Sequence, residues 1–156
     1  TVQLHAVILL KKLLSSQDNI QCLMDRGILS ILLPCLEQHD NPRLQLAAAR
    51  ALTRITRGTA AQIEVFVAHP GSMERIQQLL HAPHKAVRVE ALRVLFFILE
   101  NALHLRDTML QMDLLPPLLR MIQPDASVVE LRGAVWIVTC LCESKTMPLP
   151  LQTVEE

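Results

Sequence analysis

The chain is poor in aromatic residues. It has no tyrosine, one tryptophan and three phenylalanines, so aromatic residues make up only 3% of its 156 positions. Apolar residues nevertheless reach 51%, so the buried surface must come from leucine, isoleucine, valine and alanine. This composition suits closely packed helices and argues against a β-sandwich, because strands favour aromatic and β-branched residues.

The sequence also lacks net charge and a long hydrophobic run. It carries 15 basic and 15 acidic residues, which gives no reason to expect nucleic acid or an anionic membrane as a partner. Its longest largely apolar run, 134–142, is well short of the ~20 residues that cross a bilayer. We therefore predict no membrane span and no membrane contact from this segment, and any electrostatic preference must be local.

Motifs for catalysis or metal binding are missing as well. Cys140 and Cys142 lie two residues apart, which on a helix points their side chains about 200° from each other, and no second Cys or His pair stands nearby. His81 and His84 flank a turn without further convergent ligands. Neither a glycine-rich phosphate loop nor a nucleophile setting is recognisable. We expect no enzyme activity, no metal and no cofactor.

The chain does contain one helical sequence pattern that occurs four times, most clearly at 43–58. Five positions at offsets 0, 4, 7, 8 and 11 form an apolar stripe on a helix of 3.6 residues per turn. Nineteen of the twenty positions are apolar, the second is always alanine, and the exception is Glu130. A period of 42 to 43 residues with such a stripe is typical of an α-solenoid. The copies are Val2, Ala6, Leu9, Leu10, Leu13; Leu44, Ala48, Ala51, Leu52, Ile55; Val87, Ala91, Val94, Leu95, Ile98; and Glu130, Ala134, Ile137, Val138, Leu141.

Prolines, glycines and polar turns divide each period into a short, a medium and a long helix. We predict a repeat segment over 1–145. The helix of the first, partial repeat spans 2–14, and the helices of the three following repeats span 19–57, 60–100 and 103–143. Residues 146–156 read as an extended lead-in to a following unit, so we expect a piece of a longer array. Gly27 should adopt a left-handed turn, Pro34 should kink or shorten the helix around it, and 103–112 should form one helix.

Three helices per period resemble the armadillo repeat rather than the two-helix HEAT repeat. Within that class four stretches carry a closer resemblance: LQLAAARALTRITRGT, AVRVEALRVLFFI, LHLRDTMLQMDLLPPLL and LRGAVWIVTCLCESK. They resemble importin-α, the adaptor that carries nuclear-localisation signals, and the likeness covers essentially the whole chain. The resemblance implies an all-α, right-handed superhelix of about three complete armadillo repeats plus the last helix of a preceding repeat.

In importin-α, Trp-x-x-x-Asn pairs on the long helices hold a lysine-rich peptide, and only one of the six corresponding positions is kept in this chain. The resemblance therefore implies a retained scaffold with a rewritten groove. The tryptophan positions map to Arg50, Arg93 and Trp136, the asparagine positions map to Arg54, Phe97 and Cys140, and the acid that takes the key lysine maps to Asn101.

A second stripe on the helix at 43–57 carries four arginines at offsets 0, 7, 11 and 14. Such a face is often only a solvated basic surface, but in a groove it would repel a lysine-rich signal and favour an acidic segment. Phe97 and Trp136 are candidate exposed anchors for a partner, unless they turn inward to fill a gap. Arg93 could stack on Trp136 or pair with Glu90 and close the groove itself. The candidate groove residues are Arg50, Arg54, Glu90, Arg93, Phe97, Asn101, Trp136 and Cys140.

Two functions remain open. The first is a non-catalytic protein-binding scaffold of importin-α type, linked to nuclear transport, that takes a protein or peptide segment but not classical signals. The four irregularly spaced cysteines favour reduced thiols, hence the cytoplasm or nucleus. The alternative is a structural armadillo scaffold with a self-filled groove, part of a larger membrane-associated or coiled-coil-containing protein. Buried Phe97 and Trp136, with Arg50 and Arg93 bound to internal acids, would favour the alternative.

Overall fold

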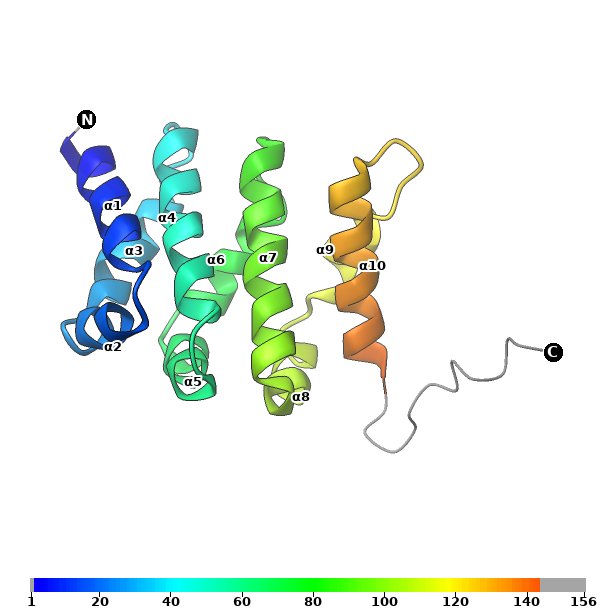
Figure 1. Cartoon of the computed structure of the whole chain (residues 1–156). Helices are drawn as coiled ribbons and strands as arrows, with labels where there is room; N and C mark the ends of the chain where they lie inside the picture. The colour runs from blue at the N-terminus through cyan, green and yellow to red at the C-terminus, as the bar shows by residue number, and fades with distance from the viewer. Residues whose placement is uncertain (1, 144–156) are drawn as a thin grey trace.

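The computed structural model describes residues 2–143. Its four long helices stand side by side in chain order, as Figure 1 shows. They are α1 (Val2–Leu13), α4 (Pro42–Thr56), α7 (Lys85–Asn101) and α10 (Val128–Cys142). The predicted lead-in at 146–156 lies outside the described residues.

Shorter helices connect the long ones and cover one side of the row (Figure 1). Each of the last three long helices ends a unit that begins with a short helix, so α1 stands as the last helix of a preceding unit. The predicted all-α solenoid is confirmed for the described residues. The connecting elements are α2 (Gln17–Asp25) and α3 (Ile28–Leu36); α5 (Ala60–Ala68) and α6 (Ser72–Leu79); and the 3-10 turn η1 (Leu103–Leu105) with α8 (Arg106–Leu110) and α9 (Leu115–Arg120).

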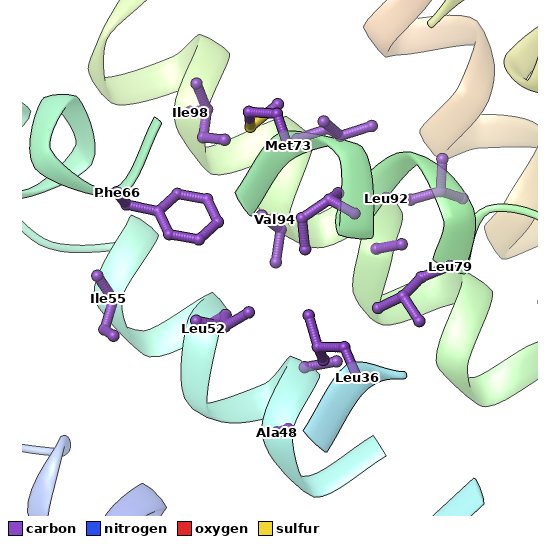
Figure 2. Close-up of a cluster of buried hydrophobic side chains, with 14 of the residues drawn as sticks. Leu36, Ala48, Leu52, Ile55, Phe66, Met73, Leu79, Leu92, Val94 and Ile98 are labelled. Atoms are coloured by element: carbon purple, nitrogen blue, oxygen red, sulfur yellow. The ribbon is translucent and has the colours of Figure 1, made fainter. Parts of the chain in front are cut away.

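The apolar stripes of α4, α7 and α10 build the core. The alanine at the second stripe position is fully buried in all three helices, as Ala48, Ala91 and Ala134. In Figure 2, Leu52 and Ile55 of α4 lie with Ala48 in one buried cluster that also includes side chains from α3, α5, α6 and α7. A methyl group at this position lets neighbouring helices approach closely, since a larger side chain would exceed the available volume.

Most of the same stripe on α1 faces solvent, and only Leu10 of the five positions is partly buried. Leu9 is 59% exposed and Leu13 is 50% exposed, whereas Val7 and Leu14 are buried, and α1 packs against α4. The helices that cover the stripe in the other units have no counterpart against α1 among the described residues. The repeated pattern therefore has two burial states within one chain.

Turn residues and caps set the boundaries between helices. Gly27 has a φ of 78°, so the predicted left-handed turn is confirmed; glycine adopts this conformation without a Cβ clash. Thr59 and Gln62 form a reciprocal capping box at the start of α5. The Gln62 side chain also accepts a 2.8 Å hydrogen bond from Gln17 and donates one of 3.2 Å to Gln21. One buried amide thereby joins α5 to α2 of the preceding unit.

α3 continues through Pro34 from Ile28 to Leu36, so the helix is not shortened there; Pro34 lies on the exposed side, and the predicted alternative, a kink, stays a prediction. One local prediction was wrong. Residues 103–112 do not form one helix, since a 3-10 turn precedes the short α8. His104 in that turn lies 2.7 Å from Glu64 of α5, and buried Arg106 donates to the Glu143 carbonyl at the end of α10. Tight turns of this kind are common at helix starts.

No single helix within residues 2–143 is long and apolar enough to cross a membrane, although α2 and α3, bent by 89°, pass that length and composition criterion as a pair. Within the same residues, no three His, Cys, Asp or Glu side chains converge on a point that could hold a metal ion.

Candidate functional site

Glu90 of α7 is the centre of the polar contacts on the long-helix face. Its side chain is 5% exposed, and its Oε1 accepts from Arg93 Nη1 at 3.0 Å and from Arg50 Nε at 3.5 Å. The Thr53 hydroxyl of α4 lies 3.1 Å from the other carboxylate oxygen. These contacts compensate the buried charge, which would otherwise be costly. One carboxylate thus connects α4 and α7.

The arginines bound to Glu90 remain accessible. The Arg50 side chain is 48% exposed and that of Arg93 is 57% exposed. A guanidinium has five N–H donors, and each arginine uses only one on Glu90. The structure therefore brings together three of the predicted groove residues and leaves most of the arginine donors available for a ligand.

A hollow of about 310 Å³ opens between α4 and α7 beside this cluster. We call it the basic hollow. Arg54 lies in it without an ion pair among the described residues, and Glu90 is its only acid. An anionic group entering the basic hollow would meet guanidinium groups from both helices. Its lining residues are Lys11, Arg50, Thr53, Arg54, Arg57, Glu90 and Arg93.

A second hollow of about 280 Å³ continues from the first, sharing Arg50, Glu90 and Arg93 with it. We call it the side hollow, and Lys85 adds a further cation there. Next to it lies an apolar notch of about 120 Å³ between α7 and α10. The three hollows follow one another across the long-helix face. The side hollow is completed by Ala86, Val89 and Val129, and the notch is lined by Val89, Leu92, Arg93, Phe96, Val129 and Gly133.

The predicted aromatic anchors are both half-buried. The Trp136 ring packs on Phe96 with 4.2 Å between ring centroids, and Phe96 meets Phe97 edge-on at 5.2 Å. Arg57 lies over the Phe97 ring, 5.3 Å from its centroid, within the range of a cation–π contact. Arg93 pairs with Glu90, as one of the two expected alternatives had it. Neither aromatic side chain is fully exposed or fully buried.

Asn101 and Cys140 have mainly internal contacts. Asn101 Nδ2 donates to the Thr56 carbonyl at 3.3 Å and links the end of α7 to α4. Cys140 packs against the core, and burial, helped by the nearby Glu143 carboxylate, raises the pKa of its thiol. A raised pKa keeps the thiol protonated at neutral pH and makes it a poor nucleophile.

Sequence reasoning overlooked several residues of these hollows. Lys11 comes from α1, and Lys85 opens α7. Val129 occupies in the last unit the position that Arg43 has in α4, 86 residues earlier, so extending the arginine stripe by two periods would have found it. Phe96 lies between the two stripes, and no periodic signal marks it.

Comparison with known proteins agrees with this architecture. Residues 16–57 match the Armadillo/beta-catenin-like repeat family model. Over 150 residues the chain is 32% identical to importin subunit alpha-2 of Arabidopsis thaliana, and over 154 residues it is 36% identical to importin subunit alpha-3 of Caenorhabditis elegans. These alignments cover 95% and 97% of this chain but only 28% and 29% of the relatives.

Solved structures with the same fold include a designed armadillo repeat protein in complex with the peptide (KR)4. It superposes with a TM-score of 0.78 at 23% identity, over 87% of this chain and 56% of that one. A second designed armadillo repeat protein gives 0.78 at 22% identity, over 88% and 57%. With the helix order, these likenesses show that the described residues have the armadillo-repeat fold, and the chain is similar to importin α subunits over most of its length.

Proposed function

We propose that this segment is a non-catalytic peptide-binding module whose long-helix face takes an acidic segment of a partner protein. The observation that carries the proposal is the composition of the basic hollow, where five cations surround one carboxylate that is already hydrogen-bonded. Charge of one sign in a concave, partly desolvated surface attracts the opposite sign and rejects its own.

The relatives are importin α subunits, which supports a place in nuclear transport and in the cytoplasm or nucleus. Binding of the lysine-rich signals that importin-α carries is not supported for this chain. Where the resemblance calls for paired tryptophan and asparagine, the chain has Arg50 with Arg54 and Arg93 with Phe97. A lysine-rich signal would approach these guanidinium groups with like charge, which costs binding free energy.

The structural scaffold remains a second candidate, favoured by the internal contacts of the face. Arg50 and Arg93 contact Glu90, and Phe96 covers part of Trp136. The roughly half-exposed arginine side chains weigh against a closed groove. The two functions differ in one measurable respect, because a self-filled face binds no peptide.

Fluorescence anisotropy with labelled glutamate-rich and lysine-rich peptides tests the proposal. We expect micromolar binding of the glutamate-rich peptide only. This binding should weaken as ionic strength rises, because the Debye length shortens and the charges are screened more strongly. The double variant Arg50→Gln with Arg54→Gln should bind about fivefold more weakly, since loss of two exposed charge pairs at about 0.5 kcal/mol each costs about 1 kcal/mol, and 1.4 kcal/mol is tenfold.

A matched control removes the same charge elsewhere. Arg26 and Arg132 are exposed and line none of the three hollows, so Arg26→Gln with Arg132→Gln should leave affinity nearly unchanged. Micromolar binding of the lysine-rich peptide, abolished by Trp136→Ala, would overturn the proposal that the altered groove no longer binds lysine-rich signals. Failure of both peptides to bind would favour the structural scaffold.

A further inference from the structure

The apolar notch adjoins the basic surface without a break. Val89, Arg93 and Val129 line both the notch and the side hollow, and Arg93 also lines the basic hollow. A segment lying across the long helices from α4 to α10 would therefore pass from guanidinium groups to an apolar recess. The apolar notch, at about 120 Å³, is too small for a separate ligand but can receive one side chain.

Gly133 keeps the apolar notch open. A Cβ placed on Gly133 would lie 3.2 Å from Leu92 Cδ1 and 3.5 Å from Leu92 Cβ, closer than an ordinary van der Waals contact for the first atom. Glycine inside a helix costs about 1 kcal/mol relative to alanine. That cost is understandable where α7 and α10 approach each other and a side chain at this position would occupy the space between Val129 and Phe96.

We propose that the notch is a specificity subsite for one bulky aliphatic side chain in the acidic segment. The inference rests on the proposed function and names the partner more closely, as a peptide with an acidic cluster and a leucine-like residue beside it. Charge complementarity fixes the acidic part on α4 and α7, and continuity of the hollows fixes the apolar part between α7 and α10.

Helix spacing sets the separation between the two parts. Neighbouring packed helices lie about 8–10 Å apart, and an extended chain advances about 3.3 Å per residue. The aliphatic residue should therefore stand about three residues from the nearest carboxylate. A peptide with a central run of glutamates and one leucine three residues beyond each end satisfies this spacing in either chain direction.

The test measures the affinity of that peptide and of a copy with both leucines changed to serine. Burying most of a leucine side chain should make the leucine peptide bind about tenfold more tightly. This advantage should persist at raised salt, because apolar contacts are not screened, whereas the affinity of both peptides should fall together.

Protein variants locate the subsite. Val129→Asn puts a polar amide at the rim of the notch and should abolish most of the leucine advantage. Val135→Asn is the matched control, since Val135 is an exposed valine of the same helix, 43% exposed against 54% for Val129, and lies outside the notch. Gly133→Leu should fill the notch and have the same effect as Val129→Asn; its circular dichroism spectrum and thermal midpoint show whether it folds.

The possible results distinguish failure of the subsite from failure of the proposed function. Equal, salt-sensitive affinity for both peptides would overturn the subsite and leave the acidic-segment function standing. A leucine advantage that survives Val129→Asn would place the contact elsewhere and also overturn the subsite. Binding of neither peptide would overturn the proposed function and the subsite together.

Discussion

Glu130 is the one charged residue in the repeated apolar stripe, and its environment explains how the stripe accepts it. The residue is 6% exposed, and its Oε1 receives Arg88 Nη2 at 2.7 Å and Arg88 Nε at 2.8 Å. Ser127, the N-cap of α10, donates to Oε2 at 2.6 Å. Arg88 is held in turn by the carbonyls of Ala82 and Pro83. The carboxylate thus joins α10 to the start of α7.

These contacts predict an acid-sensitive contribution to stability. Burial alone would raise the pKa of Glu130, but the hydrogen bonds from Ser127 and Arg88 outweigh it and lower the pKa below its ordinary value. A lowered folded-state pKa gives stability that is present above the unfolded-state pKa and lost as pH falls through the folded-state value. Glu130→Gln should therefore cost about 1–2 kcal/mol at pH 7 and less at acid pH.

Urea unfolding at pH 7 and near pH 3.5 measures this difference directly. The free energies of unfolding of wild type and Glu130→Gln should converge at the lower pH. Glu74→Gln is a suitable control, because Glu74 is an exposed glutamate that also lies in the first turn of its helix, α6. A constant gap between Glu130→Gln and wild type at both pH values would show that ionisation of Glu130 does not stabilise the fold.

At the scale of the element, one helix pattern occurs in two environments. Ala48 of α4 is fully buried, whereas Ala6, at the same template position on α1, is exposed. The sequences of the two helices do not distinguish these states, because both stripes are apolar and of equal period. Only the presence of a covering pair of helices decides which alanine is tightly packed.

Ala48→Leu and Ala6→Leu form a matched pair. Three added carbons in the packed site should cost about 3 kcal/mol through overpacking, while the exposed site should change by no more than about 0.5 kcal/mol. Thermal and urea unfolding followed by circular dichroism compare them. A similar loss in both variants would mean that α1 is covered in solution and that its stripe is a buried surface.

The helices themselves were largely predictable, and many contacts between them were not. Periodicity located the buried stripes of α4, α7 and α10, and glycine at position 27 marked a turn that only a residue tolerant of positive φ adopts easily. Extension of the second stripe by one period placed Glu90 on the groove face, yet its burial depends on Arg50 and Thr53, which lie 40 and 37 residues away. Pairings at such separations leave no local signal.

For the whole molecule, the stacking of units limits how far a local change can spread. Each long helix packs against its neighbours in the row, α1 with α4, α4 with α7 and α7 with α10. A solenoid of this kind has a stability that approximates a sum over units and their interfaces. Damage at one end should therefore leave the other end folded.

Ile137→Ala tests this independence. Ile137 of α10 is fully buried, so its truncation should cost about 2–5 kcal/mol by loss of apolar contacts and cavity formation. Hydrogen exchange read by mass spectrometry should then speed up in α8, α9 and α10, with α1 to α4 unchanged. Equal acceleration in all helices would show that the described residues unfold as one cooperative unit.

The shared carboxylate of Glu90 has a mechanical consequence. It joins Arg50 of one unit to Arg93 of the next, and the angle between successive units sets the pitch of a solenoid. An acidic segment bound as proposed would share Arg50 with Glu90 and so weaken one of the contacts between α4 and α7. Under the proposed function, occupancy of the basic hollow and the angle between the two units would be thermodynamically coupled, so ligand binding would change the curvature of the solenoid.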